Sequence, residues 1–284
     1  MTETPPLVDT QWLAAHLTTP DVRIVDASWY LPQQGRDARA DYRAAHIPGA
    51  VFFDLDDISD SQSPYPHMLP GPEKFSSRVR ALGLGDGHHI VVYDGMGLFS
   101  APRAWWMFRA MGHEDVSVLD GGFPKWQAEH RPVEDITPIV HPRHFTARLN
   151  AVLRRDRAAM LDAVATGREQ IVDARPKDRF SGVAPEPRPG LRRGHIPGSL
   201  NLPFTDVLGP DGTLRPPAEL KRLFTDAGLD LSAPIVTSCG SGVTAAILSL
   251  ALTCLGHRAN ALYDGSWAEW GAESDVLGGL PVEV

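Results

Sequence analysis

The sequence predicts an α/β protein made of two tandem domains, each a largely parallel sheet flanked by helices. Three observations predict this fold class. The chain has 284 residues, more than a single hydrophobic core usually supports. One series of sequence landmarks occurs twice, with copies 144 to 149 residues apart. Within both copies, short β-branched runs alternate with longer helical patterns, as in domains with parallel sheets.

The repeated landmarks divide the chain into two domains. They are RIVDAS at 23–28 with QIVDAR at 170–175, HIPGA at 46–50 with HIPGS at 195–199, IVVYDG at 90–95 with PIVTSCG at 234–240, and LDGGFPKW at 119–126 with YDGSWAEW at 263–270. Chance does not keep that order and spacing, so we expect a duplicated domain. The stretch 134–150 is rich in proline and polar residues and shows no sustained period. We therefore expect an N-terminal domain at 1–138, a linker at 139–152 and a C-terminal domain at 153–284.

The expected elements follow from local pattern. Residues 90–93 of the first copy and residues 171–172 and 235–236 of the second are β-branched runs that predict strands. Residues 101–111 predict a helix, and Pro102 suits its first turn. Residues 244–255 are apolar almost all the way round, which predicts a deeply buried helix.

Bulk properties exclude several classes of protein. The net charge of -8 argues against non-specific nucleic-acid binding, which needs a basic face. No apolar run reaches the roughly 18 residues of a membrane span, and the first residues lack a signal-peptide pattern, so we expect a cytoplasmic protein. Two cysteines exclude a disulfide scaffold. The histidines form no ligand-spaced cluster, so we expect no metal and no cofactor.

Cys239 is the candidate nucleophile. It lies where the expected strand ends and the apolar helix begins, and ligands bind at the carboxyl ends of parallel strands. The small residues Gly240, Ser241 and Gly242 let the backbone curl and aim several N–H groups at one anionic centre. Such a nest stabilises a thiolate or a persulfide. The alternative is a buried, inert cysteine before a core helix.

The first copy supplies an internal comparison. Asp94 stands where Cys239 does, and a carboxylate there also favours an N–H nest, so the first domain holds an anion but lacks the nucleophile. A cysteine-dependent phosphatase needs an arginine six residues after its cysteine, and this chain has Ala245 there, which argues against phosphatase chemistry. Cys254 lies within the apolar helix and is expected to be structural.

The double HIPG, the paired domains, the replacement of cysteine by aspartate in the first copy and the CGSGVT loop together resemble the two-domain rhodanese superfamily. Within it, the sequence resembles the sulfurtransferases that use 3-mercaptopyruvate, over essentially the whole chain from about residue 7. The resemblance implies that Cys239 takes sulfur from this anionic donor as a persulfide, releases pyruvate, and passes the sulfur to a small thiol, a thioredoxin-like dithiol or cyanide. The persulfide would rest in a nest formed by Gly240, Ser241, Gly242, Val243 and Thr244.

The resemblance also points to the other site residues. Arg179 and Arg188 would clamp the donor's carboxylate and carbonyl, since arginine binds such groups in a bidentate manner. Solvated loop arginines are the alternative. Ser241, His67 and Asp56 would form a proton relay beside the cysteine, which brings the first half of the chain into the site.

The choice of donor depends on the loop. Thiosulfate-using members of the superfamily usually carry basic residues directly after the cysteine, whereas this chain has Gly240 and Ser241. Mercaptopyruvate is therefore the expected donor, and thiosulfate is the alternative. A non-catalytic sulfur carrier or regulatory binding module is the alternative from another class.

Overall fold

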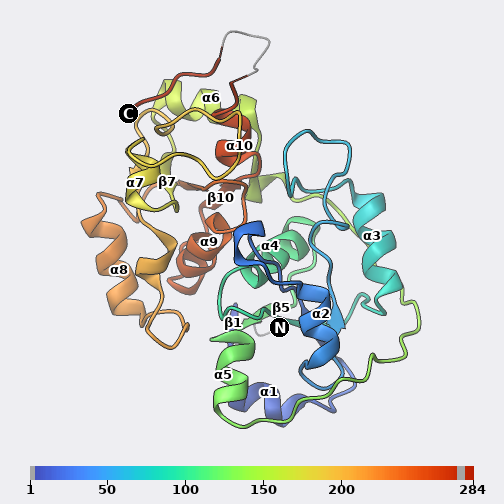
Figure 1. Cartoon of the computed structure of the whole chain (residues 1–284). Coiled ribbons are helices and arrows are strands. Elements are labelled where there is room, and N and C mark those ends of the chain that lie inside the picture. The colour runs from blue at the N-terminus through green and yellow to red at the C-terminus, as the bar shows by residue number, and fades with distance from the viewer. Residues whose placement is uncertain (1–3, 274–278) are drawn as a thin grey trace. The chain divides into compact units, whose positions relative to one another are not determined.

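The computed structural model describes residues 4–273 and 279–284, which form two compact units, each with its own five-stranded sheet (Figure 1). Unit 1 comprises Met1–Ser61, Leu69–Asn150 and Leu208–Leu214. Unit 2 comprises Gln62–Met68, Ala151–Val207 and Arg215–Val284. Each unit thus takes a short segment from the other half of the sequence. We name Gln62–Met68 the first arm and Leu208–Leu214 the second arm.

Unit 1 is built on a sheet of strand order β1-β5-β4-β2-β3, in which every pairing is parallel. The strands are β1 (Leu7–Val8), β2 (Val22–Asp26), β3 (Val51–Phe52), β4 (His89–Tyr93) and β5 (Val116–Leu119). Four of the five residues of β4 are buried, as expected for a central strand covered on both faces.

Helices cover both faces of this sheet. They are α1 (Thr10–His16), α2 (Ala38–Ala44), α3 (Pro72–Ala81), α4 (Ala101–Ala110) and α5 (Gly122–Ala128), with a 3-10 turn, η1, at Pro32–Gln34. Leu13, Tyr42 and Trp126 from α1, α2 and α5 join one core cluster with Val91 of β4. On the other face, Phe75 of α3 and Phe108 of α4 pack with ring centroids 5.4 Å apart.

Unit 2 repeats the plan, with strand order β6-β10-β9-β7-β8 and only parallel pairings. Its strands are β6 (Arg154–Arg155), β7 (Gln170–Asp173), β8 (Leu200–Asn201), β9 (Ile235–Ser238) and β10 (Asn260–Tyr263). Its helices are α6 (Arg157–Thr166), α7 (Lys177–Phe180), α8 (Pro217–Asp226), α9 (Ala245–Cys254) and α10 (Ser266–Trp270), with 3-10 turns η2 (Ala151–Leu153) and η3 (Phe204–Val207). Figure 1 shows α6, α7 and α10 on one side of the strands and α8 and α9 on the other.

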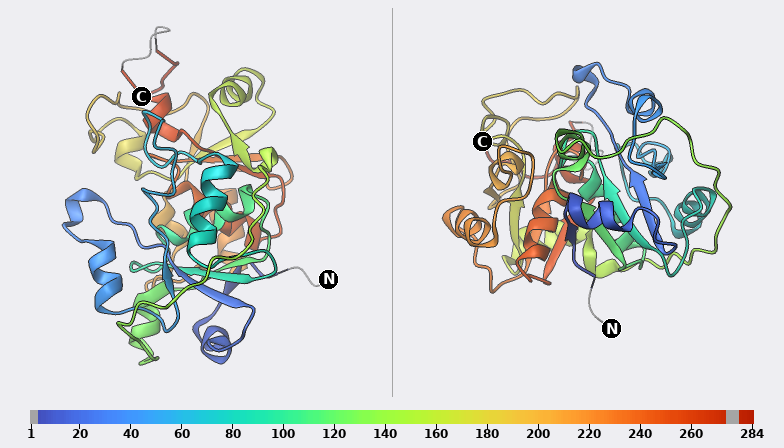
Figure 2. Two further views of the ribbon diagram at one scale, coloured as in Figure 1. Left: turned by 90° about the vertical axis from the view of Figure 1, so that its right-hand side faces the viewer. Right: turned by 90° about the horizontal axis from the view of Figure 1, so that it is seen from below.

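The predicted α/β class with two parallel-sheet domains is confirmed. The expected strands appear as β4, β7 and β9, and the two expected helices appear as α4 and α9, both almost wholly buried. The segment that follows α5 runs without helix or regular strand up to η2, and Figure 2 shows it as a long green trace over unit 1.

The repeated HIPG motif closes a turn in each unit. His46 Nδ1 lies 2.7 Å from the Tyr42 carbonyl, and its ring stacks on that tyrosine. In unit 2, His195 Nδ1 lies 2.9 Å from the Phe180 carbonyl and stacks on Phe180 in the same way. The histidines of the motif therefore have a structural role in both copies.

The order of the strands defines where a ligand can bind. From β2 the chain continues to β3 on one side, whereas β4 lies on the other side, and the same reversal occurs between β7 and β9. In open parallel sheets the crevice at such a reversal, at the carboxyl ends of the strands, is the usual binding site. In unit 2 the candidate ligand site is therefore formed by the residues that follow β7 and β9.

Candidate active site

Cys239 directly follows β9 and is buried. Its backbone is fixed from α10: the Cys239 N–H donates to Ser266 Oγ at 3.2 Å, and the Trp267 N–H donates to the Cys239 carbonyl at 2.9 Å. The next carbonyl, of Gly240, accepts from the Ala268 N–H at 2.8 Å. These three bonds hold the start of the loop rigidly over the sheet.

The equivalent loop of unit 1 shows what this backbone shape does. The carboxylate of Asp94 accepts hydrogen bonds from the N–H groups of Met96, Phe99, Ser100 and Ala101, at 2.8 to 2.9 Å. Asp94 is buried, so these N–H groups replace water as the partners of its charge. The loop between β4 and α4 is thus a backbone nest filled by a side-chain anion.

In unit 2 the same nest is not filled by a side chain. Within the parts of the chain that the structure describes, the N–H groups of Ser241, Thr244 and Ala245 donate to no other residue. Gly242 has φ 74, which lets the loop turn back without strain. Cys239 occupies the position of Asp94, so the donors of this loop remain for negative charge on sulfur.

His67 and Ser241 come together although 174 residues separate them in sequence. The first arm carries His67 into unit 2, where its Nδ1 lies 3.1 Å from Ser241 Oγ. Both residues are buried, and His67 has φ 61, a conformation that few residues other than glycine adopt. Two of the three predicted relay residues are therefore adjacent.

The third predicted relay residue, Asp56, belongs to unit 1. It is exposed, and its Oδ2 accepts a hydrogen bond from Trp29 Nε1 at 3.1 Å. Its membership of the relay stays a prediction.

Arg179 lies beside the nucleophile loop. It is on α7, the short helix after β7, and its Nη2 is 3.2 Å from the point that a Cβ on residue 240 would occupy. Only a glycine at 240 leaves that space open. The guanidinium also pairs with Glu186, with Nη2 2.5 Å from Oε2 and Nε 3.2 Å from Oε1.

Three charged residues of this site were not predicted from the sequence. Arg175 bonds the carboxylates of Asp173 and Glu186, both at 2.8 Å, and its guanidinium lies 4.3 Å over the ring of Trp267. A comparison of RIVDAS with QIVDAR could have found Arg175, since only the copy with the nucleophile has it. Glu186 lies between two prolines in a loop, a context that gives no signal of burial.

Arg188 follows two residues after Glu186 and is partly exposed. The structure does not test its predicted role in a clamp, and the clamp with two arginines stays a prediction.

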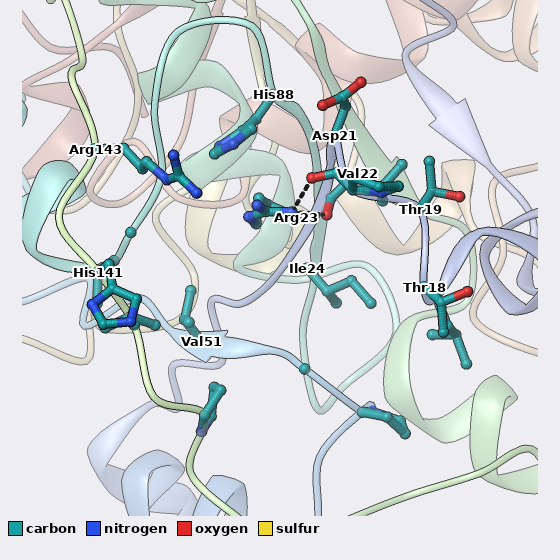
Figure 3. Close-up of a pocket in the computed structure, with 18 of the residues that line it drawn as sticks. Thr18, Thr19, Asp21, Val22, Arg23, Ile24, Val51, His88, His141 and Arg143 are labelled. Carbon is teal, nitrogen blue, oxygen red and sulfur yellow. Dashed lines mark hydrogen bonds between the residues drawn. The ribbon is translucent and has the colours of Figure 1, made fainter.

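A cavity of about 580 Å³ lies elsewhere, at the amino ends of β2 and β4 in unit 1. Figure 3 shows Arg23, Arg143 and His88 extending toward the same part of it. Burial, Arg23 and Arg143 all lower the pKa of His88, so this histidine is neutral near pH 7. The cavity is at the end of the sheet opposite Asp94 and contains no cysteine, so it is separate from the candidate active site.

Neither a metal-binding cluster nor a membrane-spanning helix is present among the described residues. Among residues 4–273 and 279–284, no group of three or more histidine, cysteine, aspartate or glutamate side chains is arranged to hold a metal ion. Over the same residues, no helix has the length and apolarity to cross a membrane.

Comparisons with known proteins show the family to which the chain is similar. The model of the rhodanese-like domain matches twice, at residues 9–129 and 156–273. The 3-mercaptopyruvate sulfurtransferase of Escherichia coli (strain K12) is 46% identical over 277 residues, which cover 97% of each chain. The enzyme of that name from Rattus norvegicus is 46% identical over 93% of this chain and 91% of its own. The thiosulfate sulfurtransferase of Mus musculus is 45% identical over the same shares.

Solved structures of related proteins have a similar fold. The crystal structure of the 3-mercaptopyruvate sulfotransferase SseA from Escherichia coli superposes with a TM-score of 0.86 at 43% identity, over 93% of this chain and 99% of that chain. The Tum1 protein from Saccharomyces cerevisiae superposes with a TM-score of 0.87 at 33% identity, over 96% and 97% of the two chains.

Proposed function

This chain belongs to the rhodanese family and is a sulfurtransferase, and we propose that it takes sulfur from 3-mercaptopyruvate onto Cys239 and passes it to a thiol or to cyanide. The observation that carries the proposal is the difference between the two loops. In unit 1 the backbone nest is filled by the Asp94 carboxylate, whereas in unit 2 Cys239 stands there and the N–H groups remain for a sulfur anion.

The donor is an α-keto acid, and Arg179 supports its recognition. A carboxylate with a neighbouring carbonyl suits a guanidinium, which presents paired donors at a fixed spacing. Arg179 places such donors at the edge of the loop, beside Gly240, and Arg188 would supply the second arginine of the clamp. The loop itself has no basic side chain between Cys239 and Ala245, so the positive charge comes from α7 and the loop that follows it.

Sulfur transfer proceeds by one displacement. The Cys239 thiolate attacks the donor's sulfur, and the bond between that sulfur and C3 of the donor breaks. Its electron pair goes to C3 and forms the enolate of pyruvate, whose oxygen lies next to the carboxylate held by arginine. The proton of the donor's thiol is transferred to C3, which gives pyruvate and an anionic Cys239 persulfide. The pair of Ser241 and His67 is suited to carry this proton.

The persulfide then reacts with the acceptor. An acceptor thiolate or cyanide attacks the outer sulfur, and Cys239 leaves as a thiolate. The N–H groups of Ser241, Thr244 and Ala245 stabilise the anionic sulfur before and after the transfer. No cofactor takes part in this scheme.

The function is tested with mercaptopyruvate as donor and cyanide as acceptor. We expect wild-type protein treated with donor alone to release pyruvate and to gain the mass of one sulfur atom on the peptide that contains Cys239. The Cys239→Ser protein should lose both signals, with turnover down by about 10³-fold or more. A Cys254→Ser protein is the matched control and should keep both. A Cys239→Ser protein that still turned over mercaptopyruvate would disprove the proposal.

Thiosulfate is the second candidate donor, because a relative of 45% identity is named thiosulfate sulfurtransferase. Steady-state rates with both donors separate the two. We expect kcat/KM to be higher for mercaptopyruvate, since Gly240 and Ser241 add no charge to the loop, and a higher value for thiosulfate would reverse the assignment.

The cytoplasmic location is also a proposal, supported by the need of Cys239 for a reducing compartment. One relative from Arabidopsis thaliana is named as mitochondrial, so fractionation of cells has to decide between the two compartments.

A further inference from the structure

Glu186 is a buried carboxylate beside the candidate active site. Its side chain is only 2% exposed, and it lies between two guanidinium groups. Oε1 accepts from Arg175 Nη1 at 2.8 Å and from Arg179 Nε at 3.2 Å, and Oε2 accepts from Arg179 Nη2 at 2.5 Å. A buried carboxylate needs this number of charge-assisted partners to offset its loss of water.

The Arg175 side of this cluster is immobile. Arg175 is 1% exposed and bonds the Asp173 carboxylate at the end of β7. Its Nη2 also donates to the Gly194 carbonyl at 2.8 Å, and its guanidinium stacks on Trp267. With all of these contacts in place, Arg175 fixes one oxygen of Glu186 relative to the central sheet.

On the other side of the cluster, Glu186 is the one side chain among the described residues that bonds the Arg179 guanidinium. Arg179 is 22% exposed and lies on a helix of four residues, which by itself holds a long side chain loosely. Glu186 accepts from the Nε and Nη2 edge of its guanidinium. Among residues 4–273 and 279–284, Nη1 has no hydrogen-bond partner, so the edge that carries it can take a substrate anion, and Nη2 lies beside Gly240.

We propose that Glu186 is a positioning residue, which holds Arg179 over the Cys239 loop in the orientation that binds the donor's carboxylate. Asp173, Arg175, Glu186 and Arg179 form a chain of alternating charges, in which Glu186 is the link between the buried Arg175 and the partly exposed Arg179. The proposal rests on the function proposed above, because it assigns Glu186 a role in binding the α-keto acid donor.

The test is the kinetic behaviour of a Glu186→Gln protein. Glutamine keeps the volume and one acceptor oxygen but loses the charge that pairs with both arginines. We expect KM for mercaptopyruvate to rise about 10- to 100-fold, because a displaced binding group costs that much, with a smaller change in kcat. Pyruvate, added as a product inhibitor, should lose affinity by a similar factor. The rate at which preloaded persulfide enzyme reacts with cyanide should not change.

The matched control is Glu169→Gln. Glu169 forms an equally bidentate pair with Arg155 in unit 2, with Nη2 to Oε1 at 2.7 Å, and both side chains are about one-fifth exposed. This variant removes a comparable ion pair at β6 and should leave KM unchanged. A rise in KM in the control as large as that in Glu186→Gln would show a general loss of stability and overturn the proposal.

A double-mutant cycle separates positioning from structure. If Glu186 acts through Arg179, the Arg179→Lys/Glu186→Gln protein should bind pyruvate no more weakly than Arg179→Lys alone. Additive losses in the double variant would overturn the proposal. If the wild-type protein does not use mercaptopyruvate, the proposed function fails. If Cys239→Ser is inactive but Glu186→Gln keeps the wild-type KM, only the role of Glu186 fails.

Discussion

Asp26 and Asp173 occupy equivalent positions at the ends of β2 and β7, but their surroundings differ. Asp173 pairs with the guanidinium of Arg175, whereas the equivalent partner of Asp26 is the hydroxyl residue Ser28. Burial raises the pKa of Asp26 to about 6, against opposing hydrogen bonds from Ser28 and Tyr93, and the nearby Asp94 raises it further. The copy without the nucleophile therefore has a carboxyl group that keeps its proton up to about pH 6.

This difference predicts a pH dependence of stability. The pKa of Asp26 is higher in the folded state than in the unfolded state, so its protonated carboxyl group stabilises the fold. This stabilisation is fully present below about pH 4 and is lost as the pH rises through about 6. We expect Asp26→Asn to stabilise the protein at about pH 8 by about 2 to 3 kcal/mol, and to have little effect at about pH 4. Chemical denaturation at the two pH values measures this.

The comparison variant is Asp173→Asn, which leaves the buried Arg175 with one carboxylate fewer. It should destabilise the protein at both pH values. Equal effects of Asp26→Asn at both pH values would contradict the assignment of the titration to Asp26.

We expect substitution of Gly240 and substitution of Gly242, both in the nucleophile loop, to have different effects. A Cβ on Gly240 meets Arg179 Nη2 at 3.2 Å, whereas Gly242 has φ 74, where a side chain is strained. We expect Gly240→Ala to raise KM for mercaptopyruvate several-fold with unchanged stability. Gly242→Ala should cost about 1 to 2 kcal/mol of stability. Thermal unfolding and initial rates distinguish them, and a destabilised Gly240→Ala protein with normal KM would contradict the contact.

At the scale of elements, the junction of β4 with α4 and the junction of β9 with α9 are equivalent strand-to-helix junctions, with Asp94 in one and Cys239 in the other. The sequence predicted the order of strand, loop and helix at both junctions, because a β-branched run, a loop of small residues and a long apolar stretch are local patterns. Cys239 was identified as a candidate in this way, whereas the family resemblance pointed to Ser241 as a relay residue, and both lie in the loop after β9.

The Asp94 junction provides a stability prediction. Asp94→Ala removes a buried carboxylate that accepts four backbone hydrogen bonds, and it leaves those N–H groups without partners. We expect a loss of about 2 to 4 kcal/mol in the free energy of unfolding. Asp230 also accepts bonds from its own loop but is exposed, so Asp230→Ala should show no measurable change. Equal unfolding midpoints for the two variants would rule out the role of Asp94.

The parts of the site that the sequence did not predict belong to segments whose sequence has no hydrophobic periodicity. Glu186 is in a proline-rich loop, and its burial depends on Arg175 and Arg179, which come from before and within α7. Neither hydrophobic pattern nor spacing reports an ion pair between loop residues. The family resemblance pointed to Arg179 but gave no partner for it.

At the scale of the whole molecule, the two units do not coincide with the two halves of the sequence, because each unit includes one arm from the other half. The first arm brings His67 to Ser241 in unit 2. The second arm lies in unit 1, where the Leu214 N–H donates to Asp120 Oδ1 at 2.8 Å. The sequence repeat does not reveal such an exchange, because repeated landmarks show which segments are alike and not which of them pack together.

This exchange predicts that the second half alone is incomplete. A chain of residues 151–284 contains Cys239 and Arg179 but lacks His67. We expect it to release pyruvate from mercaptopyruvate at least about 100-fold more slowly than the full chain, since proton transfer loses its partner. The full-length His67→Ala protein measures how much of that loss is due to the histidine. A fragment as active as the full chain would contradict the role of the first arm.

The exchanged arms also bear on how the duplicated gene can change. Because the candidate nucleophile is in the second copy, deletion of the first copy would leave Cys239 in place. Such a deletion would also remove the first arm, because the gene segment for the first copy encodes a histidine that lies 3.1 Å from Ser241. We therefore expect a variant of His67, encoded in the first half of the gene, to lower activity while every residue of the second half is intact.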